Sequence, residues 1–343
     1  MRGPMKKIKI AQIGIGHNHG AEKMQTLREL PDYFEIAGVA ESDPYWFQQR
    51  HDLPVYEGLP FMTEEELLAI PGLDAAAIET DGKYLISTAL RCAERGLHLH
   101  MDKPGGEDFA RFCKLCDLCK EKDLAFQAAY IYRYNPALKF CMDAVKNGWI
   151  GDIFEIHSVM SRDDSDNDFY RQWLSQFKGG AFYIFAGYLM DIILLMLGAP
   201  DRVTSFLKKT RDDALIDNGL AVLEYPRATA TVRVSVAEIE GFDYRRFIIC
   251  GTEGSLELCP IEARGANYYT QPLNVRMTLK QKRGSYEPGT HTVNCGTLNG
   301  RYDRQLIEFA RIINKEIINP FPIEHELLLH KTLLESCGVP VQK

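Results

Sequence analysis

Residues 6–20 (KKIKIAQIGIGHNHG) combine an apolar run with two closely spaced glycines. The four isoleucines of this segment suit a strand that is buried on both faces. Gly14 and Gly16 would let the backbone turn tightly and approach a bound phosphate, and a following helix would direct its free N–H groups at that phosphate. The third glycine of a G-x-G-x-x-G pattern is absent, because His19 occupies its place and Gly20 comes one residue later. The segment therefore predicts an imperfect dinucleotide-binding fingerprint.

An acidic residue stands at the end of the next expected strand. Phe34–Ala40 has the composition of a strand, and Glu41 follows it, 21 residues after Gly20. At this spacing a carboxylate can bind the adenine ribose hydroxyls of a dinucleotide. The alternative is a strand–turn–helix unit with an incidental surface glutamate. Since a carboxylate would repel a 2′-phosphate, and Ser42 rather than an arginine comes next, the pattern favours NAD over NADP.

His17, Asn18 and His19 fill the turn itself. Two histidines separated by one residue on a turn are poorly placed to bind one metal ion. We interpret the three residues as turn and helix-cap residues near the pyrophosphate, and we predict no metal there.

Cys113, Cys116 and Cys119 follow one another at three-residue spacing, which a zinc or iron–sulfur site could use. Steps of three residues drift slowly around a single helix, and large apolar residues lie between these cysteines. Buried cysteines commonly act as small apolar side chains. We therefore predict a packed helix without metal.

Composition limits the class of protein. The 343 residues suggest two domains, and 45% hydrophobic with 25% charged residues is ordinary for a globular protein. A net charge of −7 without a basic block argues against nucleic acid and against an anionic membrane surface as partners. We expect no apolar run of the roughly 18 residues that a membrane span needs. The start, MRGPMKK, lacks the apolar region of a secretion signal, and nine cysteines without one indicate reduced thiols in the cytoplasm.

Strand and helix signals alternate through the first third of the chain. The expected strands after Phe34–Ala40 are Pro54–Tyr56, 73–79, 97–101 and 125–131, and the expected helices include 44–51, 84–95 and 108–122. Repeated β-α-β units predict a doubly wound parallel sheet, that is, a Rossmann domain over residues 1–128. Ligands of such sheets bind at the carboxyl ends of the strands. Thr80, Asp81, Asp102 and Lys103 are therefore site candidates.

The pattern changes in residues 129–343, which we expect to form a substrate-binding and oligomerisation domain of the α+β class. A helix is expected at 136–147, and Gly180–Leu197 reads as a second, apolar helix. Strands are expected at Ile153–Ser161, 203–209, 220–225, 229–236, 246–250 and 255–258, and helices at 302–317 and 324–337. Because the strands follow one another without crossover helices, the sheet should be large, open and mostly antiparallel, with flanking helices.

Together these features resemble the glucose–fructose oxidoreductase / inositol dehydrogenase (Gfo/Idh/MocA) family almost from end to end. The shared motifs are the glycine turn, Glu41, HMDKP at 100–104, YNP at 134–136, GGA at 179–181, GTEG at 251–254 and the C-terminal helix pair. Asp-Lys-Pro looks like a variant of the family's Glu-Lys-Pro. The resemblance implies a nicotinamide site in the first domain. It also implies an open sheet in the second that covers the substrate and often forms oligomer contacts, here in a homodimer or homotetramer.

The resemblance also assigns catalytic roles and shows a departure. The family's lysine, here Lys103, lies beside the reacting hydroxyl and would take its proton. The alternative is a structural lysine paired with Asp102. The family's D-x-x-x-H pair falls on Ile184 and Tyr188; isoleucine cannot bind a hydroxyl, and tyrosine is a poor base near pH 7. Asp191, one helical turn beyond Tyr188, either contributes to catalysis or only ties its helix to a neighbour.

The expected activity is that of an NAD(P)-dependent oxidoreductase acting on CH–OH groups of a sugar, polyol, inositol or related hydroxy or keto compound. Two alternatives stay open: a cofactor-binding sensor that has lost its chemistry, and an NAD-dependent glycosidase of the same family. Tyr132 and Arg133 either face the substrate or pack between domains. Substrate specificity is expected to reside chiefly in residues 161–177 and 264–300.

Overall fold

The computed structural model describes residues 6–263, 265, 268–298 and 300–342, so the first five residues and part of the expected specificity segment 264–300 lie outside the described residues. The chain divides into two compact units. The first contains the chain up to Tyr130 together with Arg301–Leu327, and the second contains Ile131–Gly300 and Leu328–Val341. The sequence placed everything after residue 128 in the second domain. In the structure, the segment Arg301–Leu327 instead joins the first unit.

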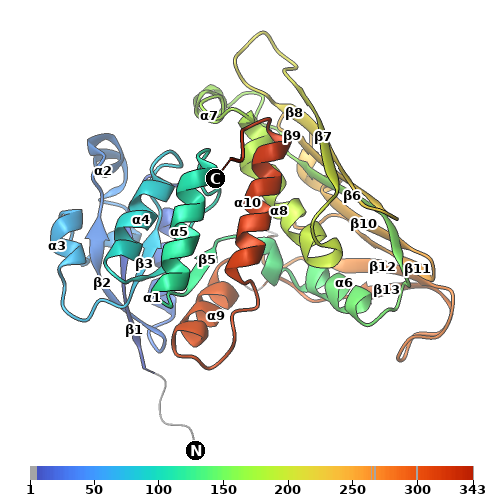
Figure 1. The fold of residues 1–343 in the computed structure, drawn as a ribbon, viewed down its shortest axis with the longest axis horizontal. Helices are drawn as coiled ribbons and strands as arrows, with labels where there is room; N and C mark the ends of the chain where they lie inside the picture. Colours follow the sequence, from blue (N-terminus) through green and yellow to red (C-terminus); the bar gives the residue numbers. More distant parts are fainter. Residues whose placement is uncertain (1–5, 264, 266–267, 299, 343) are drawn as a thin grey trace, which may run out of the picture. The chain divides into compact units, whose positions relative to one another are not determined.

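The first unit is built on a five-stranded parallel sheet of order β2-β1-β3-β4-β5 (Figure 1). Its strands are β1 Ile8–Ile13, β2 Phe34–Ala40, β3 Ala75–Ile78, β4 His98–Met101 and β5 Phe126–Ala128. Its helices are α1 Gly20–Glu29, α2 Pro44–Arg50, α3 Glu64–Leu68, α4 Leu85–Glu94, α5 Phe109–Glu121 and α9 Asp303–Ile313. The order reverses at β1, and the carboxyl ends of the strands beside such a switch point form the usual ligand crevice.

Two expected strands of this unit are corrected. Pro54–Tyr56 is a 3-10 helix, η1, because Pro54 lacks an N–H for a sheet ladder and the amide of Tyr56 instead bonds the Leu53 carbonyl at 2.9 Å. The strand expected over 125–131 ends at Ala128, and Ile131–Tyr134 forms a second 3-10 helix, η2.

Helix α9 joins the first unit through its apolar and amide side chains. Gln305 accepts a hydrogen bond from His100 of β4 at 3.0 Å, and the Phe309 ring packs against the His100 ring at 5.6 Å. These two residues are four apart and therefore lie on one face of the helix. The contacts explain why this distant segment belongs to the parallel sheet.

The second unit contains an eight-stranded sheet of order β13-β12-β11-β10-β6-β9-β8-β7. Its strands are β6 Ile153–Ser161, β7 Arg202–Lys208, β8 Asn218–Glu224, β9 Thr229–Ser235, β10 Arg246–Gly251, β11 Gly254–Leu258, β12 Asn274–Leu279 and β13 Gly289–Asn294. The neighbouring pairs are antiparallel apart from β6 and β9, which are parallel, so the expected mostly antiparallel sheet is confirmed. Strands β12 and β13, and the helix α7 Asp168–Leu174, were not predicted.

The helices α6 Pro136–Lys146, α8 Gly180–Leu197 and α10 Ile323–Ser336 complete the fold (Figure 1). Contrary to the expectation of no membrane-length run, α8 has the length and apolar composition of a membrane span. However, 83% of this helix is buried inside the protein, and α8 packs against β6, β8 and β9. Its apolar composition on all sides is therefore that of a buried core helix.

Candidate functional site

The glycine turn between β1 and α1 is held by Glu41. The amides of Ile15 and Gly16 donate to Glu41 Oε2 at 2.7 and 3.1 Å, and the amide of Asp43 donates to Oε1 at 2.8 Å. Gly14 has a φ of +93°, and a Cβ there would lie 2.3 Å from the amide nitrogen of Thr80. The first glycine is thus required by the close approach of β1 to the end of β3. The turn and Glu41 lie together, and the expected binding of the ribose hydroxyls by Glu41 stays a prediction.

A cavity of about 330 Å³ opens beside this turn, at the carboxyl ends of β1, β2 and β3. Four of the predicted cofactor residues line it: Gly14, Glu41, Thr80 and Asp81. The Thr80 hydroxyl is buried and has no hydrogen-bond partner. An unsatisfied buried hydroxyl is costly, so it marks a place where a polar ligand would be stabilised.

The charges of this cavity are mainly acidic. Besides Glu41 and Asp81, its lining includes the side chains of Asp43 and Glu64. Arg91 also lines it, but its guanidinium is bonded to the Glu64 carboxylate, with Nη2 to Oε2 at 2.7 Å. The cavity therefore favours a hydroxylated ligand over an additional phosphate.

A buried polar cluster lies where β3 and β4 end. Lys23 Nζ is 2.9 Å from Glu79 Oε1 and 3.2 Å from His100 Nδ1, and all three side chains are fully buried. Asp102 Oδ2 is 3.0 Å from His19 Nδ1 and 3.5 Å from His17 Nδ1. Lys23 and Glu79 were not predicted from the sequence, since neither belongs to a recognised motif.

Burial sets the charge states of this cluster. It lowers the pKa of His17 to about 4 and holds the pKa of His19 well below its ordinary value. It raises the pKa of Glu79. Burial alone would raise the pKa of Asp102 as well, but His17, His19 and Lys23 together lower it. At neutral pH the two histidines are thus neutral and Asp102 is ionised.

His17, His19 and Asp102 could hold a metal ion by distance alone, because their donor atoms all lie within 4.8 Å of one another. The spacing argument did not anticipate this convergence. However, His19 Nδ1 contacts Asp102 and its Nε2 contacts Arg301 at 3.3 Å, while His17 Nδ1 accepts from the His19 amide at 3.3 Å. Since these ligand atoms already have protein partners, we keep the prediction of no metal.

His19 stands at the N-cap position of α1, but its side chain makes no capping hydrogen bond. Its ring nitrogens contact Asp102 and Arg301 instead. The expected helix-cap role is thus corrected to a bridge between α1 and the end of β4. The Asn18 side chain is exposed and accepts from Arg50 at 3.4 Å.

Lys103 directly follows Asp102 in a buried position, and its amide donates to Asp102 Oδ1 at 2.7 Å. Its positive charge acts on His17, whose pKa it helps to lower. The structure therefore places Lys103 in the first unit, at the strand end that the sequence indicated, beside the histidines of the glycine turn. Its catalytic role stays a prediction.

Tyr188 and Asp191 belong to the second unit. The guanidinium of Arg133 grips Asp191 in two hydrogen bonds, Nε to Oδ2 at 2.9 Å and Nη2 to Oδ1 at 2.8 Å, and both side chains are fully buried. This geometry supports the reading in which Asp191 ties α8 to a neighbour, here η2. The Tyr188 ring packs 5.2 Å from the Tyr132 ring. Ile184, on the same helix, is buried.

A second cluster of buried polar side chains includes Tyr132, whose ring packs against that of Tyr188. The Tyr132 hydroxyl donates to Glu262 at 3.0 Å, and Glu262 is also paired with Arg245. Arg245 in turn donates to the Ser161 carbonyl at 2.8 Å. Glu262 and Arg245 were missed from the sequence, because they lie in loops without a recognisable motif.

The cysteine helix α5 packs as expected. Cys113, Cys116 and Cys119 are all buried, and burial raises the pKa of the Cys119 thiol to about 12 and also that of Cys116. A metal bound there would have to displace the protons of these buried thiols, and the absence of metal stays a prediction.

We expect no stoichiometric iron or zinc in protein purified without chelators, as measured by elemental analysis. Cys116→Ala, with Cys259→Ala as an exposed-cysteine control, should leave the metal content unchanged. Metal that is lost in the Cys116 variant alone would contradict this prediction.

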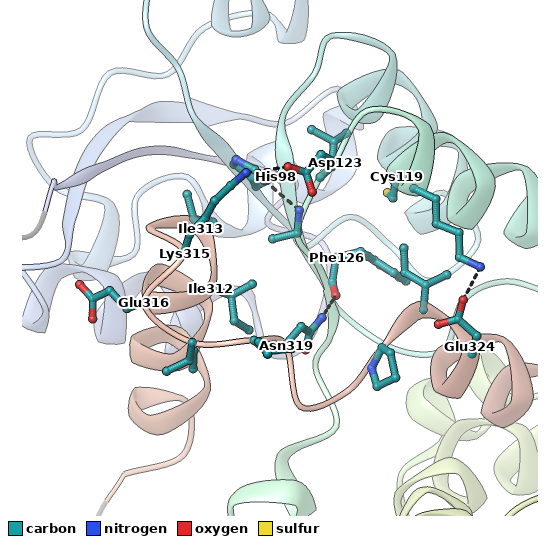
Figure 2. A pocket seen from close by; sticks show the side chains of 17 residues that line it. His98, Cys119, Asp123, Phe126, Ile312, Ile313, Lys315, Glu316, Asn319 and Glu324 are labelled. Atoms are coloured by element: carbon teal, nitrogen blue, oxygen red, sulfur yellow. Dashed lines mark hydrogen bonds and ion pairs between the residues drawn. The ribbon is translucent and has the colours of Figure 1, made fainter.

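A larger cavity of about 690 Å³ lies elsewhere in the first unit, between β5 and the segment that follows α9 (Figure 2). Two ion pairs border it, Lys315 with Asp123 at 2.7 Å and Lys120 with Glu324 at 2.5 Å. None of the predicted site residues lines it. We therefore place the candidate active site at the carboxyl ends of β1 to β4.

The glycine turn, the acidic cavity and the open second sheet define a dinucleotide-binding oxidoreductase fold joined to an α+β domain. Residues 140–257 match the family model for the GFO/IDH/MocA C-terminal domain. This match, which lies in the second unit, supports the assignment of the chain to the Gfo/Idh/MocA family of oxidoreductases.

Among curated proteins, an uncharacterised oxidoreductase of Escherichia coli K12, YhhX, is 27% identical over 72% of this chain and 70% of its own length. A D-xylose 1-dehydrogenase (NADP(+)) of Haloferax volcanii is 28% identical over 59% of this chain and 62% of its own. Among solved structures, an oxidoreductase of Agrobacterium radiobacter in complex with NAD+, L-tartaric acid and magnesium superposes with a TM-score of 0.79 at 15% identity, covering 97% of each chain. That structural likeness concerns the fold.

Proposed function

We propose that this protein is an NAD-dependent oxidoreductase that exchanges hydride between a nicotinamide and a CH–OH or carbonyl carbon of a sugar, polyol, inositol or related compound. The observation that carries the proposal is the acidic 330 Å³ cavity at the switch point of the parallel sheet, where Glu41 faces the glycine turn. The named cofactors of the two relatives, NADP for the xylose dehydrogenase and NAD+ for the Agrobacterium oxidoreductase, support a nicotinamide.

The residues present fit such a cofactor. Glu41 would accept hydrogen bonds from the adenine ribose hydroxyls, and the unpartnered Thr80 hydroxyl would bind a polar group of the same ligand. A bound NAD would supply the hydride acceptor. Lys103, in its neutral amine form, would take the hydroxyl proton of the substrate and become an ammonium, while ionised Asp102 fixes the Lys103 backbone through its amide. Tyr188 is proposed to bind the substrate oxygen.

We expect the native protein to bind NAD more tightly than NADP, because Glu41 would repel a 2′-phosphate. Glu41→Ala should weaken NAD binding by about tenfold to a hundredfold, the scale of a charge-assisted hydrogen bond of about 1.5–3 kcal/mol. The same change should reduce the discrimination against NADP. Calorimetry with both cofactors measures this, and Glu57→Ala provides a control on an exposed glutamate outside the cavity. Tighter binding of NADP by the native protein would contradict the assignment of Glu41.

The buried isoleucine at position 184 favours a second candidate, a sensor that binds cofactor without chemistry. A glycosidase that reduces and reoxidises its cofactor within each turnover is a third. A panel of sugars, polyols and their oxidised forms with NAD or NADP, followed at 340 nm, separates them. Net NADH formation supports the dehydrogenase, bond cleavage without net NADH supports the glycosidase, and ligand binding without either supports the sensor.

We also propose that the protein is a homodimer or homotetramer that uses the second sheet. The side chain of Phe206 is 53% exposed on β7, and Leu220 and Val222 of the neighbouring β8 are only partly buried. Apolar side chains on an open sheet face are typical of association surfaces. Light scattering on the full chain, with Phe206→Asp as the test variant, measures the oligomeric state. A monomer at micromolar concentration would contradict the proposal.

A further inference from the structure

The indole of Trp46 covers the second glycine of the turn. A Cβ built on Gly16 would lie 2.7 Å from Trp46 Cδ1, 2.9 Å from Cγ and 3.0 Å from Nε1. Glycine occupies this place in dinucleotide-binding turns so that the pyrophosphate can approach the backbone closely. Here a side chain of α2 fills the approach that the glycine leaves open. Trp46 itself is 9% exposed, so the ring is packed and not free in solvent.

Arg50 holds this ring in place. Its guanidinium lies over the Trp46 ring, 4.4 Å from the centroid, and is four residues further along α2. The same guanidinium donates to the carbonyl oxygens of Ile15 at 2.8 Å and His17 at 2.7 Å. The indole is thus enclosed between the glycine turn and a cation that is itself anchored to the turn.

The amide groups of the turn are also engaged. Ile15 and Gly16 donate to Glu41, as described above, and His17 donates to the Glu79 carbonyl at 2.9 Å. A phosphate needs such amides as donors. The amides of the turn therefore already have acceptors within the protein. Binding of a pyrophosphate requires both the Trp46 indole and the Glu41 carboxylate to move away from the turn.

We propose that Trp46 is a gate over the pyrophosphate subsite, a role that rests on the proposed dinucleotide function. The 330 Å³ cavity, whose lining does not include Trp46, accepts the adenosine part with the gate closed. The pyrophosphate then displaces the indole from Gly16 and replaces the Glu41 carboxylate as acceptor of the turn amides. Glu41 is thereby released to bind the ribose. Arg50 stays bound to the turn carbonyls but loses its contact with the indole, and its guanidinium then lies beside the pyrophosphate. Dinucleotides therefore bind with a penalty that adenosine does not incur.

Calorimetry with ADP-ribose and with adenosine tests the gate. If the closed state is favoured by about ten to one, the apparent affinity for ADP-ribose is reduced by about tenfold. Trp46→Ala should then bind ADP-ribose about tenfold more tightly than the native protein, while its affinity for adenosine stays unchanged. Trp149→Ala, a tryptophan of the second unit, is the matched control.

Fluorescence provides a second readout in a protein with its native turn. The chain has three tryptophans, so Trp149→Phe with Trp173→Phe leaves Trp46 as the sole emitter. Saturating ADP-ribose should increase acrylamide quenching of Trp46, and adenosine should not.

The outcomes separate the two proposals. Equal or weaker ADP-ribose binding by Trp46→Ala, or unchanged quenching on saturation, overturns the gate while leaving dinucleotide binding intact. Failure of both the native protein and Trp46→Ala to bind ADP-ribose and NADH overturns the proposed cofactor and the gate with it. Binding by Trp46→Ala alone would be the strongest support for the gate.

Discussion

Replacing Lys103 by methionine is expected to lower turnover by roughly 10²–10⁴-fold, the usual scale of a general acid–base contribution. Methionine keeps much of the length of the side chain but cannot accept a proton. Lys103 carries this role alone in our proposal, because Ile184 stands where the family resemblance places a carboxylate. Asp102, which fixes the Lys103 backbone, would remain in place. NAD affinity should hardly change, since the glycine turn and Glu41 are untouched.

The measurement is steady-state kinetics on a substrate that the native protein oxidises, together with calorimetry for NAD. Lys139→Met is a suitable control, because Lys139 is exposed in the second unit and pairs with Asp143 of the same helix at 2.9 Å. Full turnover by Lys103→Met would eliminate Lys103 as the proton acceptor. Reduced turnover with equally weakened NAD binding would instead indicate a structural role.

The same kinetic assay tests helix α8, in which Ile184 and Tyr188 replace the Asp and His that the family resemblance implies. Tyr188→Phe should cost less than Lys103→Met, because it removes one hydrogen bond worth about 0.5–1.5 kcal/mol. Ile184→Asp combined with Tyr188→His restores the pair that the family resemblance implies. A gain in turnover on a simple polyol would identify the native site as a weakened dehydrogenase.

Removing the carboxylate of Asp191 is expected to destabilise the second unit by about 3–5 kcal/mol, because it breaks a buried ion pair by removing one of its two charges. Both side chains are fully buried and joined by two hydrogen bonds. Removing one charge of a buried ion pair is more costly than replacing both charges by apolar groups of similar size. Asp191→Leu with Arg133→Met, which replaces both charges by apolar groups, should therefore be less destabilising than Asp191→Ala alone.

Urea unfolding of the full chain, followed by circular dichroism, measures this effect. Asp143→Ala is the matched control, since Asp143 is an exposed helical aspartate whose ion pair should contribute little. Unchanged stability of Asp191→Ala, with a loss of turnover, would reverse the assignment and make Asp191 a catalytic residue rather than a structural tie.

By itself, the sequence determined the elements whose signals are local. The isoleucines of β1, the glycine turn and Glu41 lie close together in the chain or at a fixed spacing, and the structure places them as expected. The bounds of α8 and β6 follow from runs of apolar or alternating residues, which report burial directly. Pro54–Tyr56 was misread because a short apolar run does not distinguish a strand from a helical turn.

Only the tertiary structure decided which residues meet. Periodicity shows that a side chain is buried but does not name its partner, so Lys23 with Glu79, and Arg133 with Asp191, could not be paired from the sequence. The same reason explains why α9 joins the parallel sheet through Gln305. It also explains the position of Trp46 on Gly16. The two residues are 30 apart in the chain, and only the packing of α2 brings them into contact.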